Sequence, residues 1–540
     1  MMRTAGAAAR TGWRPGRRPP FVLWALALCS VALVLLPLVY LVIRAGGGDA
    51  SAWSVLGRRG TAETILNTVA LVAGVTASSV AIGVPLAWLV TRTDLPGRKV
   101  WAVAAALPLV IPSYVAALAL LGAFGPRGLL QQALEGPLGV ERVPEIYGYP
   151  GALLALTLST YPYVFLLAMA GFRGVDPSLE EASAGLGRSR GATFFRVTLP
   201  VARPSIAAGA LLVALYTLAD FGAVSLMQYD SLTRAIFLQY RALFDRTPAA
   251  VLALVLVALT AIVLVLEAAA RNRRRASGGR PASGRVARPV ELGRWRVPAV
   301  GLCIIVTGAF LAVPLAVLGY WLERAVSTGQ DLSLAWGPLG NTILVAFAAA
   351  GAATLAALPV ALLARRHPSR ATATVERLAY TSNALPGIVI ALSLVFFAAR
   401  YASPIYQTLG LLIVAYVVRF LPEALAGTGS ALAAVSPAVE EAAAGLGRSP
   451  LRVLVAVTIP LARAGILAGA ALVVLSTMKE LPATLLLRPS GFETLATEIW
   501  RFTSIGAYSR AALPALLLVA AAAPAVYFLV RRGAREARRP

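Results

Sequence analysis

Few residues of this chain could carry covalent or metal chemistry. One histidine, His367, and two cysteines, Cys29 and Cys303, occur in 540 residues, and both cysteines lie within apolar segments. We therefore expect no disulfide framework, zinc site or haem site. The stretch from Gly185 to Gly191 lacks the lysine of a phosphate-binding loop, and the pattern G-x-x-x-x-G-K-[ST] occurs nowhere in the sequence. The sequence predicts neither an enzyme nor a nucleotide-binding chain.

Charged side chains close to apolar segments are the remaining candidates for a functional role. Asp220 follows one such segment, and Lys479 and Glu480 stand at the matching place later in the chain, with Tyr216 and Tyr229 near Asp220. Charges at membrane depth are costly and often functional, so these five residues are candidates for lining a substrate pathway. The alternative, equally weighed, is that the acids cap a helix end or pair locally.

The surrounding sequence predicts an all-α, polytopic membrane protein. Hydrophobic residues make up 58% of the chain and charged residues 14%, which a water-soluble domain could hardly tolerate on its surface. A membrane span needs roughly 20 mostly apolar residues. Twelve segments meet this requirement, centred near residues 32, 78, 111, 161, 216, 260, 310, 353, 387, 415, 470 and 520.

The net charge of +25 reflects membrane topology and excludes a nucleic-acid binder. About 34 of the 49 Lys and Arg residues fall in the termini and in alternate loops, as the positive-inside rule requires if both termini are cytoplasmic. The apolar run from Phe21 to Ile43 is too long for a signal peptide. We therefore expect it to be retained as the first span.

An internal repeat organises the chain. The segment from Glu180 to Ser189 recurs from Glu440 to Ser449 with nine of ten positions identical, at an offset of 260 residues. The same offset aligns Asp220 with Glu480, and slightly larger offsets align Asn67-Thr68 with Asn341-Thr342 and Leu107-Pro108 with Leu385-Pro386. The chain is a tandem duplication of two six-helix halves that share one orientation across the membrane.

The repeat predicts five regions. They are a cytoplasmic tail (1–20), a first transmembrane domain (21–270), a cytoplasmic linker rich in Arg, Gly, Ser and Pro (271–297), a second transmembrane domain (298–531) and a cytoplasmic tail (532–540).

The repeated segment predicts a short helix between the fourth and fifth spans of each half. Asp176-Pro177 and Ser436-Pro437 each place an N-cap side chain before a proline suited to the first helical position. Paired glutamates follow in the first turn, and glycines then end the helix. Small residues beside an exposed leucine would suit docking of a partner protein. We call the residues predicted to dock or support this partner the coupling residues. They are Glu180, Glu181, Ala182, Gly185, Leu186, Gly187, Pro200, Glu440, Glu441, Ala442, Gly445, Leu446, Gly447 and Pro460.

These loops resemble the EAA loop of bacterial ABC importer permeases. The pattern matches Glu181-Ala182-Ser183, Gly187 and Pro200 in the first half, and Glu441-Ala442-Ala443, Gly447 and Pro460 in the second, with mild departures such as Ser183 for Ala. The resemblance covers nearly the whole chain.

The resemblance implies a permease subunit of the bacterial inner membrane with no cofactor of its own. It implies two partners. One is a separate ATP-binding-cassette subunit, expected as a dimer, that binds ATP and Mg and receives each loop helix in a cleft, and the other is a periplasmic or lipid-anchored substrate-binding protein.

The substrate is less defined. The stretches Ala219 to Leu226 and Lys479 to Pro489 are similar to those of fused ferric iron permeases, and trivalent iron favours oxygen ligands such as carboxylates and phenols. Permeases for thiamine, polyamines or sulfate stay open as alternatives. An ATP-independent secondary transporter of two six-span halves is the alternative from another class.

Overall fold

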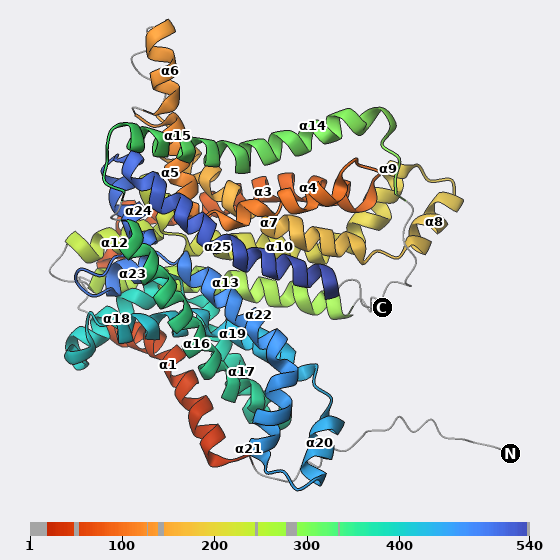
Figure 1. The fold of residues 1–540 in the computed structure, drawn as a ribbon, viewed down its shortest axis with the longest axis vertical. Helices are drawn as coiled ribbons and strands as arrows, with labels where there is room; N and C mark the ends of the chain where they lie inside the picture. The colour runs from red at the N-terminus through yellow and green to blue at the C-terminus, as the bar shows by residue number, and fades with distance from the viewer. Residues whose placement is uncertain are drawn as a thin grey trace. The chain divides into compact units, whose positions relative to one another are not determined.

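The computed structural model describes residues 19–47, 53–126, 128–138, 145–242, 247–276, 289–332 and 335–536 (Figure 1). Both predicted tails therefore lie partly outside the described residues, as does much of the predicted linker. The helices of the first half are α1 (Phe21–Gly46), α3 (Arg59–Arg92), α4 (Arg98–Ala104), α5 (Ser113–Phe124), α6 (Leu129–Leu138), α7 (Tyr149–Arg173), α8 (Pro177–Gly185), α9 (Arg190–Thr193), α10 (Leu199–Ala219), α11 (Gly222–Leu226), α12 (Leu232–Ala242) and α13 (Thr247–Ala276).

The second half repeats this order. Its helices are α14 (Arg296–Thr307), α15 (Val313–Ser327), α16 (Trp336–Arg366), α17 (Arg370–Ala379), α18 (Gly387–Tyr401), α19 (Leu409–Ala433), α20 (Pro437–Gly445), α21 (Pro450–Val453), α22 (Ile459–Met478), α23 (Pro482–Leu487), α24 (Leu495–Ser504) and α25 (Tyr508–Glu536). Short 3₁₀ segments are η1 (Ser54–Gly57), η2 (Leu107–Val110), η4 (Gly293–Trp295), η7 (Tyr380–Ala384) and η8 (Ser403–Ile405), and π-helical segments are η3 (Phe194–Thr198), η5 (Gly308–Ala312) and η9 (Leu454–Thr458).

The predicted all-helical, polytopic architecture is confirmed. In the described part of the chain, 11 helical runs are long and apolar enough to cross a membrane, or 12 if one bent pair counts as a span. The one β-type pairing among these residues is an isolated bridge between Thr93 and Val290.

The spans predicted near residues 111 and 387 are not straight helices. Around residue 387, the run Arg370–Ala384 meets α18 at an angle of 101°. Around residue 111, α4 and η2 precede α5, which begins at Ser113. Prolines explain both breaks, because a proline disfavours helical geometry in the residue before it. Pro112 and Pro386, each just before a helix, adopt nearly the same extended backbone, with φ/ψ of −62°/152° and −57°/148°.

This geometry corrects one alignment of the repeat. The sequence pattern pairs Leu107-Pro108 with Leu385-Pro386, whereas the structure makes Pro112 the counterpart of Pro386. The offset becomes 274 residues, the same as that between Thr68 and Thr342. Both prolines follow an apolar residue, so the sequence pattern alone did not separate the two registers.

The chain divides into two compact units, and each takes segments from both halves of the repeat. The smaller unit comprises Met1–Pro37, Val345–Asn383 and Ile413–Thr477, and the larger comprises Leu38–Leu344, Ala384–Leu412 and Met478–Pro540. In the smaller unit, Ser30 of α1 donates a hydrogen bond to the carbonyl of Ala356 in α16 at 3.0 Å. In the larger unit, Trp321 of α15 donates to the carbonyl of Gly122 in α5 at 3.1 Å. The first span of each half therefore packs against the other half.

Glycines allow close helix contacts in both units. In the larger unit, a Cβ on Gly209 of α10 would lie 2.9 Å from Cα of Val164 in α7. In the smaller unit, a Cβ on Gly427 of α19 would lie 2.5 Å from Cα of Gly469 in α22. Small residues let membrane helices approach to backbone contact, where dispersion replaces the hydrophobic driving force that lipid does not supply. The fourth and fifth spans of each half are thus held in direct contact, and they carry the loop between them.

Candidate functional site: two loop helices and a pair of carboxylates

The repeated loop forms the predicted short helix in each half. These helices are α8 (Pro177–Gly185) and α20 (Pro437–Gly445), each with proline in its first turn. Asp176 caps α8 by accepting a hydrogen bond from the backbone N–H of Ser178 at 3.0 Å. Ser436 makes no side-chain cap on α20, so the prediction of a second capping side chain is wrong. The fixed φ of Pro437 and the carboxylate of Glu440 remain to support the start of α20.

Glycine ends each loop turn where the backbone requires it. Gly187 has φ of +76° and Gly447 has φ of +78°, in the left-handed region that side chains with a Cβ disfavour. A Cβ at either position would meet nothing within 4 Å. Backbone conformation, rather than crowding inside this chain, therefore accounts for glycine at these two positions.

Each loop helix has an inward and an outward face. In α8, Glu180 is partly covered and Ser183 is buried, three residues apart, and Ser183 shares a 2.9 Å hydrogen bond with Thr193 of α9. The outward side carries an unusually exposed leucine, Leu186 at 76% and Leu446 at 82%. The other predicted coupling residues that are exposed are Glu181, Ala182, Gly185, Gly187, Glu441, Ala442, Gly445, Gly447 and Pro460.

A buried arginine holds the inward glutamate in the first half. Arg92, the last residue of α3, keeps only 6% of its side chain exposed and forms an ion pair with Glu180 at 2.5 Å. Thr198 of η3 donates a hydrogen bond to the other carboxylate oxygen of Glu180 at 2.6 Å. We call this group of Arg, Glu and Thr the clamp. It links the second span, the loop helix and the start of the fifth span.

The second half builds the same clamp from the matching residues. Arg366, the last residue of α16, pairs with Glu440 and also donates to Thr458 at 2.8 Å. Thr458 donates in turn to Glu440 at 2.5 Å. Thr198 and Thr458 follow the 260-residue offset of the repeated segment, whereas Arg92 and Arg366 belong to the basic residues that the positive-inside rule already explained. Their common offset of 274 residues, shared with Thr68 and Thr342, was the signal that could have identified them.

Proline shapes the other end of the clamp. Pro200 and Pro460 stand in the first turn of α10 and α22, directly after the π-helical segments η3 and η9. Proline has no N–H to donate to the preceding turn, which favours such a local widening of the helix. The threonine that reaches the glutamate is the last residue of each π-helical segment.

His367 adjoins the second clamp and stays neutral near pH 7. Burial lowers the pKa of its imidazole below the ordinary value of 6.5, and the neighbouring Arg366 guanidinium lowers that pKa further. The charge of the clamp is therefore carried by Arg366 and Glu440 alone over the physiological pH range.

Asp220 and Glu480 occupy matching positions at the starts of two short helices, both within the larger unit. Asp220 accepts a hydrogen bond from the backbone N–H of Ala223 at 3.0 Å, at the start of α11. Glu480 accepts from the N–H of Ala483 at 3.2 Å, at the start of α23. The geometry thus contains the helix-capping role that the sequence analysis weighed as the alternative to substrate contact.

The two carboxylates have complementary neighbours. Ser113, the first residue of α5, donates a hydrogen bond to Asp220. Its counterpart Gly387 begins α18, and a Cβ there would lie 2.5 Å from a carboxylate oxygen of Glu480. The longer acid in the second half therefore occupies the space that the serine side chain fills in the first half. Lys479, next to Glu480, donates to the carbonyl of Leu109 at 2.7 Å.

The two tyrosines predicted near Asp220, Tyr216 and Tyr229, contact different residues. Tyr229 donates its hydroxyl to the carbonyl of Asn67 at 2.8 Å, and the Tyr216 ring lies 5.9 Å from that of Tyr163. In the described residues, no group of three or more His, Cys, Asp or Glu side chains could hold a metal ion.

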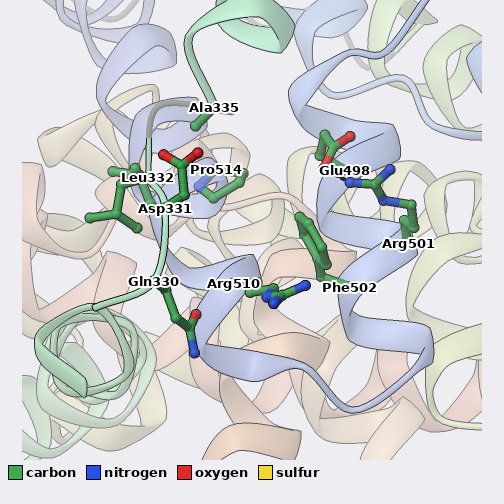
Figure 2. Close-up of a pocket in the computed structure, with 10 residues that line it drawn as sticks. Gln330, Asp331, Leu332, Ala335, Glu498, Arg501, Phe502, Arg510 and Pro514 are labelled. Atoms are coloured by element: carbon green, nitrogen blue, oxygen red, sulfur yellow. Dashed lines mark hydrogen bonds and ion pairs between the residues drawn. The ribbon is translucent and has the colours of Figure 1, made fainter. Parts of the chain in front are cut away.

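A separate small pocket lies in the larger unit between residues 330–332 and 335, which follow α15, and the helices α24 and α25, and Figure 2 shows its lining. Glu498 of α24 and Arg501 one turn later form an ion pair at 2.7 Å beside Asp331 and Arg510. Burial raises the pKa of Glu498, and Arg501 acts in the opposite direction. None of the five predicted pathway residues is among those that line this pocket.

This chain is similar to known transport proteins, both by a family model and by individual relatives. The family model described as "Binding-protein-dependent transport system inner membrane component" matches residues 79–276 and again 349–536. A Fe(3+)-transport system permease of Haemophilus influenzae is 32% identical over 508 residues, which cover 93% of this chain and 96% of the relative.

Two further relatives are more distant or shorter in coverage. A ferric transport system permease of Actinobacillus pleuropneumoniae is 25% identical over 77% of this chain and 63% of its own length. A probable molybdenum ABC transporter permease of Haloferax volcanii is 36% identical over 35% of this chain and 68% of its own length. The two tandem family matches favour binding-protein-dependent transport over the secondary transporter that the sequence analysis left open.

The clamp predicts a defined pattern of stability changes. Arg92→Gln leaves Glu180 partly buried without its cation, so we expect the free energy of unfolding to fall by about 1–3 kcal/mol. The thermal midpoint of the purified full-length protein measures this loss. Adding Glu180→Gln removes the unpaired charge and should recover part of the stability, as a double-mutant cycle would register. Arg98→Gln, at an exposed position on the next helix, is the matched control, and an equal loss there would contradict the clamp.

The carboxylate pairs predict a compensating exchange. Gly387→Ser places a side chain against Glu480 and should lower the free energy of unfolding by about 1–3 kcal/mol through overpacking. Glu480→Asp in the same protein shortens the acid by one methylene and rebuilds the first-half pair, so part of the loss should be regained. Gly301→Ser, where a Cβ meets nothing within 4 Å, should change little. Additive losses in the double variant would show that the two positions do not share this space.

Proposed function

Since this chain belongs to the family of binding-protein-dependent transport system inner membrane components, we propose that it is driven through its two loop helices and that it imports ferric iron. The family makes it a multi-pass inner-membrane transport subunit rather than an enzyme. Its partners follow from the same membership, namely an ATP-binding subunit and a substrate-binding protein.

The duplicated clamp is the observation that carries the coupling proposal. A force applied to the exposed face of α8 or α20 reaches the end of the second span through Arg92 or Arg366 and the start of the fifth span through Thr198 or Thr458. Leu186 and Leu446 supply the apolar anchor, and Glu181 and Glu441 supply charge beside it. We propose that each helix docks in a cleft of one subunit of an ATPase dimer, which binds ATP and Mg.

The orientation is proposed from charge. The loops that carry α8 and α20 belong to the Arg-rich set, which places them and both termini in the cytoplasm under the positive-inside rule. Transport then proceeds by alternating access. A binding protein delivers substrate outside, closure of the ATPase dimer moves the loop helices, and the clamps pass this motion to the spans.

The division into permease domains of 21–270 and 298–531 joined by a cytoplasmic linker of 271–297 is likewise proposed. The two matches to the family model, 79–276 and 349–536, support one domain in each half. The first span of each half packs against helices of the other half. The two domains are therefore units of the repeat, and each completes its packing with a span from the other.

Ferric iron is the proposed cargo because the iron permease of Haemophilus influenzae aligns over almost the full length of both chains. The molybdenum relative aligns over about a third of this chain. Thiamine, polyamine and sulfate remain competing cargoes. We propose that Asp220 and Glu480 shape the pathway through α11 and α23, because their carboxylates already accept backbone N–H groups. Lys479, Tyr216 and Tyr229 are proposed as neighbours of that pathway.

The turn glycines test the coupling proposal. Gly187→Val and Gly447→Val force a β-branched residue into a left-handed conformation at a cost of about 1–3 kcal/mol each and should distort the docking turn. We expect loss of ATPase copurification and of substrate-stimulated ATP hydrolysis, with membrane insertion unchanged. Gly191→Ala, also with open space around its Cβ but with an ordinary φ, is the control. Retained coupling in the valine variants would overturn the assignment of these loops.

The cargo is tested in proteoliposomes that contain this chain, its ATPase and its binding protein. We expect ATP-dependent uptake of radioactive ferric iron that excess unlabelled ferric iron abolishes. Molybdate, thiamine, spermidine and sulfate should not compete. Competition by one of these four, together with a failure to accumulate iron, would replace iron by that substrate and leave the coupling proposal intact.

A further inference from the structure

A groove of about 650 Å³ lies at one end of α3 in the larger unit, and its lining includes no residue of the clamps or of the carboxylate pair. It is bounded by α3, the start of α9, residues 290–295 and the first turns of α14. The residues that define its chemistry are Trp88, Arg190, Glu291, Arg294, Trp295 and Leu302.

Backbone hydrogen bonds hold one wall of this groove in place. The N–H of Val290 donates to the carbonyl of Arg92 at 2.7 Å, and the N–H of Asp94 donates to the carbonyl of Val290 at 3.2 Å. The carboxylate of Asp94 accepts from the N–H of Leu292 at 2.9 Å. Residues 290–292 therefore form a fixed strap across the end of the second span, next to the arginine of the first clamp.

The groove has a basic rim. Arg190 donates to the carbonyl of Glu291 at 3.2 Å and lies 3.9 Å from its carboxylate. A guanidinium has five N–H donors, so these contacts leave capacity for an anion. Arg294 and Arg296 are exposed nearby. The three arginines outnumber the two acids nearby, Glu291, which is largely exposed, and Asp94, whose carboxylate is engaged by the N–H of Leu292.

The interior of the groove is apolar and aromatic. Leu89, Ala299 and Leu302 form part of its lining, between Trp88 and Trp295. Apolar side chains around it are unusually exposed, with Trp295 at 62% and Val297 at 80%. Indole rings beside basic residues at the end of membrane helices are typical of the level where lipid headgroups meet acyl chains.

We propose that this groove binds one acidic phospholipid, with the headgroup phosphate against Arg190 and Arg294 and an acyl chain along Trp88 and Leu302. The charge of the rim and the apolar lining match the two parts of such a lipid, and basic pockets between membrane helices on the cytoplasmic side suit anionic headgroups. The proposal rests on the cytoplasmic orientation in the proposed function. A bound lipid would hold the strap against Arg92 and so support the loop that carries α8. The described residues of the second half contain no equivalent strap beside the loop that carries α20.

Lipid retention tests the proposal without any transport measurement. The complete transporter is reconstituted in nanodiscs of phosphatidylcholine with a minor share of phosphatidylglycerol, then extracted in detergent, and its bound lipids are quantified by native mass spectrometry. We expect phosphatidylglycerol to be enriched over phosphatidylcholine. Arg190→Gln with Arg294→Gln should reduce that enrichment about tenfold, because each arginine near the surface contributes to the attraction of an anionic headgroup.

The matched control is Arg98→Gln with Lys99→Gln, which removes two exposed positive charges from the neighbouring helix α4 but none from the groove lining. An equal loss of phosphatidylglycerol enrichment in the control would show that general surface charge causes the effect, and it would overturn the proposed site. Displacement of the lipid by inorganic phosphate at comparable concentration would identify a free-anion site and overturn the lipid assignment. Because the measurement counts bound lipid, an error in the proposed cargo would not alter its result. Mapping of the loops outside the cytoplasm, by contrast, would contradict the proposed function itself.

Bromine-labelled acyl chains provide a second measurement that does not depend on retention in detergent. Phosphatidylglycerol with brominated chains should quench tryptophan fluorescence more strongly in the unaltered protein than in Trp88→Phe, since the indole beside the acyl chain in the proposed pose is then missing. Identical quenching in both proteins would place the acyl chain elsewhere and contradict the proposed pose. Thermal midpoints of all variants verify that each remains folded.

Discussion

In both halves of this chain, an arginine at the end of a membrane span, buried in the case of Arg92 and partly buried in the case of Arg366, pairs with the first glutamate of the loop helix that follows two spans later. The arrangement is demanding, because a covered charge without its partner is strongly destabilising. Arg92 and Arg366 therefore constrain where α8 and α20 can lie, and the threonines at the ends of the π-helical segments add a second constraint. What remains free on each loop helix is the opposite face, with its leucine and second glutamate. The division of labour between paired glutamates follows from helix geometry, since neighbours in sequence point to different sides.

Much of this was predictable from sequence, for identifiable reasons. Membrane spans depend on long apolar runs, and the loop helices on a local proline and cap signal, so both emerged from nearby residues. The clamp did not, because Arg92 and Glu180 are far apart in sequence and an arginine in a loop already had an explanation as a topology signal. Capping by Asp220 and Glu480 was foreseen as an alternative, while its companions Ser113 and Gly387 depended on a register that two similar proline pairs left ambiguous. Ser436 shows the converse, a good local signal that the tertiary structure does not use.

The repeat also shows how one geometry can be kept with different residues. Thr68 and Thr342 each accept a hydrogen bond from the backbone N–H of the leucine that begins a later helix, Leu232 or Leu495, and both distances are 2.9 Å. The carboxylate positions, by contrast, exchange size between partners, with serine and aspartate in one half and glycine and glutamate in the other. At the carboxylate positions the two halves therefore keep the filled volume and the satisfied N–H groups with different residues.

The exchange of first spans between halves has a consequence for synthesis. Ser30 finds its hydrogen-bond partner at Ala356, so the N-terminal span emerges from the ribosome long before the helix that receives it. Trp321 closes onto Gly122 in the reverse sense, when the receiving helix is already present. The earlier half must wait in the lipid with part of its packing surface uncovered, a state in which non-native helix association competes. Joining both halves in one polypeptide keeps the awaited partner at high local concentration and fixes their ratio at one to one.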